Sequence, residues 1–271
     1  MPNLTKTAML AEQKNVHGDH GVVVTQRVVV PLSRVQSSLV TPTKSDLSRV
    51  GFCYRIDTMK FSQKGLTDFF NKTKKSSFGE PVKTVELLAQ MIPPGSVLDL
   101  GAGDGRNALY LAQKGFVVKA VDLSEAGIAK LNRLAEEAGL VVQTEVADAS
   151  SYMINSEYDV FLVVLLFQFL NEQDSLHIMH EMKKHTKQGG MNVVHVFTKS
   201  GDRQRLDLEE DRHSSCFYPN DGWLKEFYSD WEVVEHSSAS GPLIGKYHEG
   251  GMPMTSVVER IVARKPVDNL K

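Results

Sequence analysis

Two aspartates and three closely spaced glycines are the residues of this chain best suited to bind a ligand. Asp99 lies within an otherwise apolar run, Val97 to Leu100, which is followed, with single residues between them, by Gly101, Gly103 and Gly105. Glycine permits tight backbone turns and the close approach of a ligand. Asp122 stands seventeen residues after Gly105, at the end of a second apolar run, where its carboxylate can accept hydrogen bonds from both hydroxyls of a ribose. The pattern predicts a strand-turn-helix-strand unit that binds the adenosine part of a cofactor.

The spacing of the glycines indicates which cofactor this is. A dinucleotide-binding turn is normally Gly-x-Gly-x-x-Gly, so that a helix N-terminus can meet a pyrophosphate. Here the spacing is Gly-x-Gly-x-Gly. Together with Asp99, the turn resembles motif I of class I S-adenosylmethionine-dependent methyltransferases, whose cofactor has no phosphate. A nicotinamide-dependent oxidoreductase is the alternative from another reaction class, and the spacing argues against it.

Further cofactor contacts are predicted near the ends of the strands. Asp148, in the run VADAS, is placed to accept the amine of adenine, and its alternative role is to cap a helix or a turn. Arg106 and Asn107 open the helix after the glycines and can hold the methionine carboxylate by charge-assisted hydrogen bonds. Their alternatives are a surface arginine and a capping asparagine. The remaining predicted contacts are the neighbouring residues Leu123, Ala149 and Val164.

Strands and helices alternate along the chain from Met59 onward. Strands are predicted over residues 97–100, 117–121, 141–146, 158–165 and 191–197, and helices over 61–71, 81–91 and 172–187. This alternation predicts a doubly wound parallel sheet with right-handed crossovers. Residues 231–236 and 256–263 read as a closing antiparallel pair. Ligands of such sheets bind at the carboxyl ends of the strands.

The N-terminal residues differ in character from the rest. Residues 1–57 have no sustained helical periodicity, whereas residues 58–271 carry the complete predicted sheet. Three interpretations of this extension stay open: a short hairpin, a disordered segment, or upstream sequence before a start at Met59. It lacks a basic start followed by a signal-length apolar stretch, which argues against secretion.

The charge, the apolar runs and the cysteine and histidine content of the chain indicate which partners to expect. The net charge of −2 and a charged fraction of 24% give no reason to expect a nucleic-acid partner, and the longest apolar run is too short to span a membrane. Two cysteines cannot build a disulfide framework or a zinc site by themselves. The spacings of His177, His180 and His185 do not put all three on one helical face, so no metal is predicted. We expect a cytoplasmic protein, monomeric or homodimeric, acting on a small molecule.

Longer stretches of the sequence resemble a narrower family. The runs VLDLGAGDGRNALYLAQKGF, FQFLN, GGMN, WEVVEH and VARK are similar to those of the tellurite-resistance, TehB-type methyltransferases, over about Phe69 to Lys265. The resemblance implies a seven-stranded class I fold with S-adenosylmethionine as cofactor. It also implies methyl transfer to small soft nucleophiles, such as thiols or tellurium and selenium oxyanions. A non-catalytic domain that binds the cofactor is the remaining alternative.

One departure from the family bears on the acceptor. Where the family has a His-Arg pair after Gly-x-Leu, this chain has Ile244 and Gly245. Lys246 and His248 follow and are the candidates for binding an anionic acceptor, while an uncharged acceptor pocket is equally compatible. The stretch from Gly241 to Gly251 is predicted to be a mobile acceptor loop.

Overall fold

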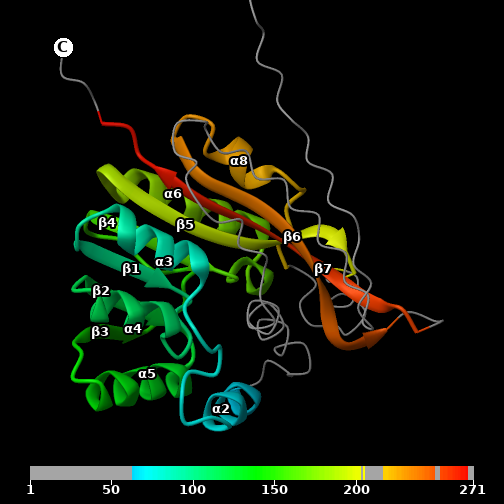
Figure 1. Cartoon of the computed structure of the whole chain (residues 1–271), viewed down its shortest axis with the longest axis horizontal. Helices are drawn as coiled ribbons and strands as arrows, with labels where there is room; N and C mark the ends of the chain where they lie inside the picture. The colour runs from blue at the N-terminus through cyan, green and yellow to red at the C-terminus, as the bar shows by residue number, and fades with distance from the viewer. Residues whose placement is uncertain (1–62, 203, 205–215, 248–250, 268–271) are drawn as a thin grey trace, which may run out of the picture. The chain divides into compact units, whose positions relative to one another are not determined.

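Seven strands form one mixed sheet in the order β3-β2-β1-β4-β5-β7-β6 (Figure 1). The computed structural model describes residues 63–202, 204, 216–247 and 251–267, so the predicted extension, residues 1–57, lies outside the described residues. The strands are β1 (Ser96–Leu100), β2 (Val117–Asp122), β3 (Val142–Val146), β4 (Tyr158–Val164), β5 (Thr186–Gly201), β6 (Glu232–Tyr247) and β7 (Pro253–Arg264). The neighbours among β1 to β5 pair in parallel, and β7 runs antiparallel to both β5 and β6. The predicted doubly wound sheet with an antiparallel closing pair is confirmed.

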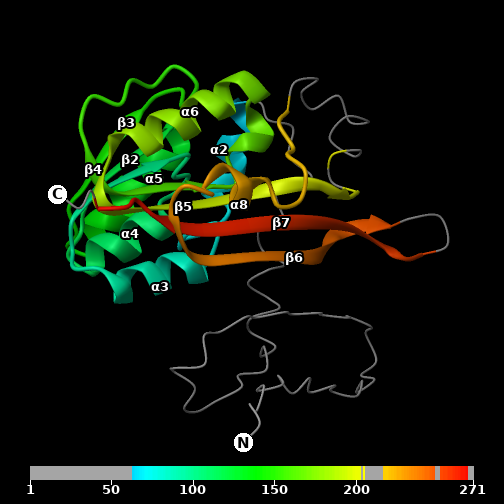
Figure 2. The ribbon, with the colours of Figure 1, turned by 90° about the horizontal axis from the view of Figure 1, so that it is seen from above.

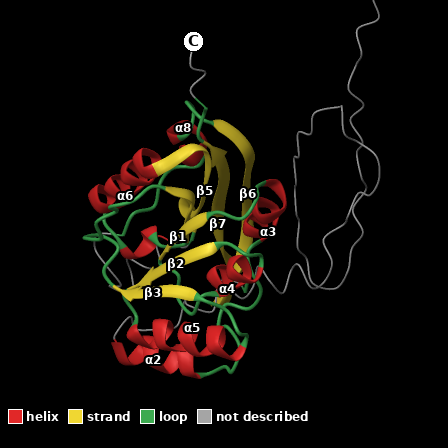
Figure 3. Ribbon diagram, turned by 90° about the vertical axis from the view of Figure 1, so that its left-hand side faces the viewer, coloured by secondary structure: helices red, strands yellow, loops and turns green. Residues whose placement is uncertain are grey.

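Helices cover both faces of the sheet (Figure 3). One face packs against α3 (Lys83–Met91), α4 (Arg106–Gln113) and α5 (Glu125–Glu137), and the other against α6 (Glu172–His185) and α8 (Trp223–Phe227). The helix α2 (Gln63–Asn71) packs on α5, and the short 3-10 helix η2 (Phe167–Phe169) follows β4. No helix among the described residues is long and apolar enough to cross a membrane.

The central strands are apolar because both of their faces are buried. In β4, four consecutive side chains have no exposed surface: Val160, Phe161, Leu162 and Val163. Alternate side chains of a strand point to opposite faces. Val160 and Leu162 accordingly pack with α3 and α4, while Phe161 and Val163 pack with α6. This double burial explains why the strand reads as a continuous apolar run rather than an alternating one.

Local hydrogen bonds fix where the helices begin and end. The side chain of Ser124 accepts from the backbone N–H of Gly127 at 3.1 Å and begins α5. At the end of α6, the Thr186 hydroxyl donates to the Met182 carbonyl at 2.6 Å. The helix therefore ends at His185, before the predicted limit of residue 187, and β5 begins there rather than at residue 191.

The predicted acceptor loop is in part a strand. Residues 241–247 belong to β6, and Gly241 pairs with Ser256 of β7. The hydrogen-bond ladder with β7 overrides the local turn signal of glycine and proline, so the loop prediction is wrong for this part. Figure 2 shows β5, β6 and β7 continuing beyond the ends of the other strands. Lys246 lies in β6, where its side chain is not described, and His248 lies outside the described residues.

Candidate functional site

The glycine turn crosses from β1 to α4 beside the end of β2. The backbone N–H groups of Gly101 and Ala102 donate to the Val121 carbonyl at 2.8 and 3.1 Å. Gly101, Gly103 and Gly105 have φ angles of 76°, 60° and 81°, a left-handed region that favours glycine. Glycine is therefore favoured at these three positions by the conformation of the backbone, apart from any contact with a ligand.

Asp122 joins this turn through both of its carboxylate oxygens. Oδ2 accepts from the Gly103 N–H at 2.7 Å, and Oδ1 accepts from the Ser124 N–H at 2.8 Å. Burial raises the pKa of Asp122, the two backbone N–H groups oppose that rise, and the Asp104 carboxylate adds to it. Because an ionised carboxylate offers about four lone-pair sites, each oxygen keeps capacity for a ligand hydroxyl.

Asp99 is buried beneath the turn with an unpartnered oxygen. Its exposed fraction is 2%, and its Oδ2 has no hydrogen-bond partner. Burial, followed by the Asp122 carboxylate, raises the Asp99 pKa to about 7, while the Arg106 guanidinium opposes the rise. A buried polar atom without a partner is rare and points to a missing ligand or water. The residue fits a cofactor that brings a hydrogen-bond donor to the turn.

Arg106 and Asn107 hold the chain segment that precedes α3. The Arg106 Nη1 donates to the Phe78 carbonyl at 3.1 Å, and its guanidinium carbon lies 5.6 Å from the centroid of the Phe78 ring. The Asn107 Oδ1 accepts from the Val82 N–H at 3.1 Å. Phe78 covers Gly103, where an added Cβ would lie 2.6 Å from the ring. Their binding of a ligand carboxylate stays a prediction.

A buried ion pair between Lys130 and Asp104, which the sequence did not predict, lies beside the glycine turn. The Lys130 Nζ lies 3.1 Å from the Asp104 Oδ2, and the two side chains are 4% and 0% exposed. Lys130 also donates to the Phe70 carbonyl at 2.8 Å and the Ser77 hydroxyl at 2.7 Å, and Asp104 accepts from the Ser76 hydroxyl at 2.7 Å. The pair ties residues 70–78, here called the cover segment, to α5 and the glycine turn. A lysine on the apolar stripe of α5 was the available signal.

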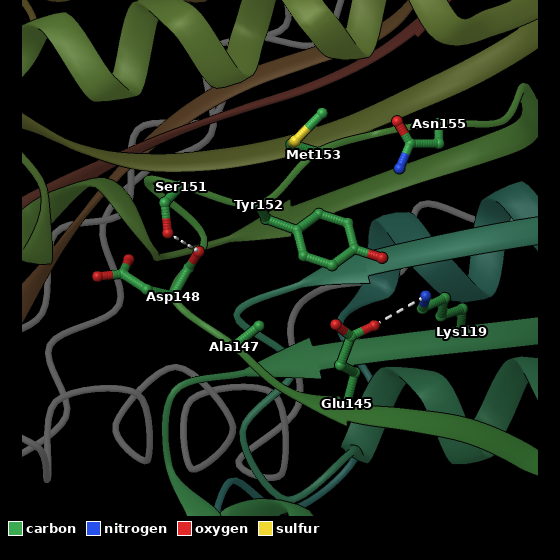
Figure 4. A pocket seen from close by; sticks show the side chains of 8 residues that line it. All are labelled: Lys119, Glu145, Ala147, Asp148, Ser151, Tyr152, Met153 and Asn155. Atoms are coloured by element: carbon green, nitrogen blue, oxygen red, sulfur yellow. Dashed lines mark hydrogen bonds and ion pairs between the residues drawn. The ribbon is translucent and has the colours of Figure 1, made fainter.

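Asp148 lies at an open pocket of about 300 Å³ after β3 (Figure 4). Its exposed carboxylate Oδ1 accepts from the Ser150 N–H at 2.9 Å, which is the turn-capping role. In Figure 4 this carboxylate points away from the Lys119–Glu145 ion pair and the Tyr152 ring. Of the other predicted contacts, Leu123 is 56% exposed at the end of β2, Ala149 is buried, and Val164 ends β4. That Asp148 accepts a hydrogen bond from the adenine amine stays a prediction.

The backbone of Leu165 and the side chain of Gln168, which follow β4, form hydrogen bonds at the carboxyl end of this strand. Leu165 has φ of 57°, and its N–H donates to the His195 carbonyl at 2.9 Å. Gln168 is 3% exposed; its Nε2 donates to the Leu165 carbonyl at 2.6 Å, and its Oε1 has no partner. A non-glycine residue in this conformation is strained, which is common at ligand sites. No sequence pattern indicated either feature.

His195, also missed, is a buried neutral group at this edge. Its Nε2 lies 2.8 Å from the Thr84 hydroxyl of α3, and its exposed fraction is 4%. Burial first, and then the guanidinium groups of Arg260 and Arg106, hold the His195 pKa well below its usual value of 6.5. The histidine thus joins β5 to α3 without carrying charge near neutral pH.

Comparisons with known proteins agree with this architecture. The family model for tellurite resistance protein TehB matches residues 64–252. The probable S-adenosyl-L-methionine-dependent methyltransferase TehB of Haemophilus influenzae is 37% identical over 177 residues, covering 65% of this chain and 59% of that protein. This chain therefore spans 59% of the length of that curated relative.

Solved structures of methyltransferases are similar to this chain. The crystal structure of TehB from Haemophilus influenzae has a TM-score of 0.59 at 31% identity, over 74% of this chain and 67% of that chain. Coclaurine N-methyltransferase bound to N-methylheliamine and SAH has a TM-score of 0.56 at 16% identity, over 83% and 89%, a likeness of fold alone. The predicted class I fold is confirmed, and this chain belongs to the TehB family of tellurite resistance proteins.

Proposed function

We propose that this chain is an S-adenosylmethionine-dependent methyltransferase acting on a small molecule. The observation that carries the proposal is the pair of aspartates at the glycine turn: Asp122 held by two backbone N–H groups, and Asp99 buried with an unpartnered Oδ2. The names of the TehB relatives support it. When bound, S-adenosylmethionine supplies a methyl group made electrophilic by its sulfonium.

The residues of the site supply binding and position. Asp122 would accept the ribose hydroxyls, Asp99 would accept from the amino group, and exposed Leu123 offers an apolar surface for the adenine. The three glycines let the backbone turn close to the cofactor. A methyl transfer from a sulfonium needs little acid or base help when the acceptor is already nucleophilic, so alignment and exclusion of water provide most of the acceleration.

The acceptor falls among three classes of small nucleophile: thiols, tellurium or selenium oxyanions, and amines. Lys246 and His248 stay candidates for binding an anion, in place of the His-Arg pair that the family resemblance implies.

The test is incubation of the purified chain with S-adenosylmethionine labelled in its methyl group, together with members of each acceptor class. We expect labelled product from at least one class and binding of S-adenosylhomocysteine in the micromolar range by calorimetry. Absence of binding to either cofactor form would refute the proposal, whereas binding without any turnover would favour the non-catalytic alternative.

A further inference from the structure

Arg260 of β7 is a cation on the sheet face that holds Asp99. It pairs with His195 of β5, whose Nε2 lies 2.8 Å from the Thr84 hydroxyl of α3. The helix α3 packs on the face that carries Val97 of β1. Side chains alternate along a strand, so Val97 and Asp99 point to the same face. Arg260 therefore lies on the α3 face of the sheet, together with Asp99.

The strand register puts Arg260 in line with the start of the glycine turn. Leu100, the last residue of β1, pairs with Val163 of β4, and the next residue of β4 pairs with His195. Gly101 is therefore level with His195 and with Arg260 beyond it. At about 4.8 Å between neighbouring strands, three spacings separate Gly101 from Arg260 by roughly 14 Å. Arg260 thus lies beside the proposed cofactor site and outside the turn itself.

The residues that follow β4 connect the glycine turn to the surroundings of Arg260. Leu166 packs on Gly101, where an added Cβ would lie 2.9 Å from the Leu166 Cδ1. The next residue back, Leu165, packs on the apolar cluster that contains Val258. The Arg260 Nη1 lies 3.5 Å from the Val258 carbonyl oxygen. Consecutive contacts therefore lead from the turn to the guanidinium.

The Arg260 guanidinium points toward the carboxyl end of β5. It reaches the carbonyl of Val258, which pairs with Phe197 near that end. This is the end at which β5, β6 and β7 continue beyond the other strands (Figure 2). Glu235 of β6 is on the same face but pairs with Val262, in the opposite direction along β7. The guanidinium is therefore turned away from this carboxylate.

The Arg260 guanidinium has hydrogen-bond donors to spare. It carries five N–H donors, and its long bond to the Val258 carbonyl uses one of them. Within the described ranges, no carboxylate forms an ion pair with Arg260. Its side chain is partly buried between Val258 and Val262, which are 3% and 0% exposed. Because a charge beside buried apolar groups is costly unless it is paired, this position favours an anionic ligand.

A second cation reinforces this preference for an anion. Burial first, and then the guanidinium groups of Arg260 and Arg106, hold the pKa of His195 well below its usual value. Both guanidinium groups therefore act on the same neutral ring. Cations gathered at one edge of a sheet create a positive potential that attracts negatively charged ligands.

Apolar side chains next to Arg260 favour an organic anion. The buried cluster on this side consists of Phe197, Tyr218, Leu243 and Val258. Leu165 and Met254 pack on the cluster and are partly exposed. A guanidinium binds a carboxylate through two parallel hydrogen bonds, and apolar side chains beside it can contact the carbon chain that carries the carboxylate. An inorganic oxyanion would leave these apolar groups unused.

We propose that Arg260 binds a carboxylate of an organic methyl acceptor and so determines which acceptors this chain methylates. The proposal rests on the methyltransferase function proposed above. Arg260 takes no part in bond formation and holds the carboxylate while another atom of the acceptor reacts. A lone pair of that atom forms the bond to the methyl carbon as the S–C bond breaks, and the electron pair of the broken bond stays on sulfur. Any proton on the reacting atom passes to solvent.

The experiment compares small thiols that differ in charge. 3-Mercaptopropionate, 2-mercaptoethanol and cysteamine, which are anionic, neutral and cationic at their second group, are titrated by calorimetry into the full chain saturated with S-adenosylhomocysteine. Selenite is titrated in the same way, as an anion without carbon. We expect 3-mercaptopropionate to bind about tenfold more tightly than each of the other three probes.

Variants locate this binding at Arg260. Arg260→Gln should weaken the binding of 3-mercaptopropionate about tenfold, while the Kd values of 2-mercaptoethanol and S-adenosylhomocysteine stay within about twofold. Arg264→Gln is the matched control, because it makes the same charge change on the same strand. Arg264 pairs with Met191, toward the amino end of β5, and forms a surface ion pair with Glu232. This control should leave the binding of all four probes unchanged.

A conservative variant keeps the test decisive should Arg260→Gln fail to fold. Arg260→Lys retains the charge but loses the planar fork that binds a carboxylate through two hydrogen bonds. We expect it to bind 3-mercaptopropionate about threefold more weakly than the parent chain, with the Kd of S-adenosylhomocysteine unchanged.

The outcomes separate this proposal from the function on which it rests. Binding of 3-mercaptopropionate no tighter than that of the other probes, or unchanged in the Arg260 variants, would overturn the carboxylate proposal and leave methyl transfer standing. A tenfold loss of S-adenosylhomocysteine affinity in Arg260→Gln would also overturn it, because Arg260 would then belong to the cofactor site. A chain that binds neither cofactor form refutes the methyltransferase proposal itself.

Discussion

At the scale of single residues, Asp122 and Asp99 differ in the hydrogen bonds that their carboxylates accept. Asp122 receives two backbone N–H groups, whereas Asp99 has an oxygen without a partner. Hydrogen bonds to the charged form favour ionisation, and burial opposes it. Asp122 is therefore built to stay in place with or without a ligand, while Asp99 gains most when a donor arrives.

Removal of the Asp122 carboxylate should weaken cofactor binding. Asp122→Ala loses two ribose hydrogen bonds to a charged acceptor, worth about 2 to 4 kcal/mol together, or roughly 30- to 1,000-fold in Kd. Calorimetry with S-adenosylhomocysteine measures this change. Asp230→Ala, at the surface ion pair with Lys183, is the control and should change Kd less than about twofold. An unchanged Kd in Asp122→Ala would remove this residue from the site.

Asp99 should make the ligand-free chain less stable as the pH rises. Its pKa is about 7 in the folded chain against 3.8 unfolded, so the folded state holds the proton longer. The free energy of unfolding then falls between about pH 4 and pH 7, by roughly 4 kcal/mol from this group. Asp99→Asn should lack this fall. Urea titrations of parent and variant at pH 5 and pH 8 measure it, and identical pH dependence would contradict the prediction.

At the scale of elements, a buried ion pair and an aromatic contact hold the cover segment against α5 and the glycine turn. The Lys130–Asp104 pair joins it to α5 and to the glycine turn, and Phe78 packs on Gly103. Since Arg106 also donates to the Phe78 carbonyl, the start of α4 and the cover segment hold one another. Loss of this pair should loosen the glycine turn as well as the cover segment.

Breaking the pair should cost both stability and cofactor affinity. Lys130→Met leaves the Asp104 carboxylate buried without its cation, which should lower the free energy of unfolding by about 3 to 5 kcal/mol. Urea denaturation and calorimetry measure the two effects. The control is Lys83→Met, at an exposed pair with Glu86, which should cost less than about 1 kcal/mol.

A double variant isolates the charge from the packing. Adding Asp104→Asn to Lys130→Met removes the uncompensated charge and should restore part of the lost stability. Equal losses in the single and double variants would show that the ion pair contributes little.

At the scale of the whole molecule, the sheet gathers groups from distant parts of the sequence. The proposed cofactor residues come from β1 and β2, and three residues with a buried unpartnered oxygen, Gln168, Thr198 and Glu259, come from η2, β5 and β7. Ligands of open α/β sheets bind at the carboxyl ends of the strands, and the glycine turn follows the carboxyl end of β1. The strand β7 returns antiparallel to β5 and places Glu259 opposite Val196.

A shortened chain that begins at Met59 should keep its fold and its cofactor affinity. All seven strands and the cover segment lie after this residue. Circular dichroism should show a Tm within about 3 °C of the full chain, and calorimetry a Kd for S-adenosylhomocysteine within about twofold. A larger loss in either measurement would mean that residues 1–57 contribute to the core or to the site.

The sequence alone determined the features that depend on neighbouring residues. Apolar runs that contain Asp99 and end in Asp122 predicted β1 and β2, and the glycines between them predicted the turn. Strand burial and the backbone freedom of glycine depend on the types of neighbouring residues. The alternation of strands and helices gave the parallel sheet by the same reasoning.

Only the tertiary structure decided the features that depend on partners distant in the sequence. Thr84 and His195 are 111 residues apart, and Asp104 is buried because Lys130 and Ser76 reach it from other elements. The predicted loop from Gly241 became strand because β7 offered a hydrogen-bond ladder stronger than the local turn preference. Glu259 is buried because β5 and β6 flank it in the sheet, and its Oε1 lies 2.7 Å from the His236 Nε2. Long-range pairing and burial have no signature in local sequence, so these parts of the site became visible only in three dimensions.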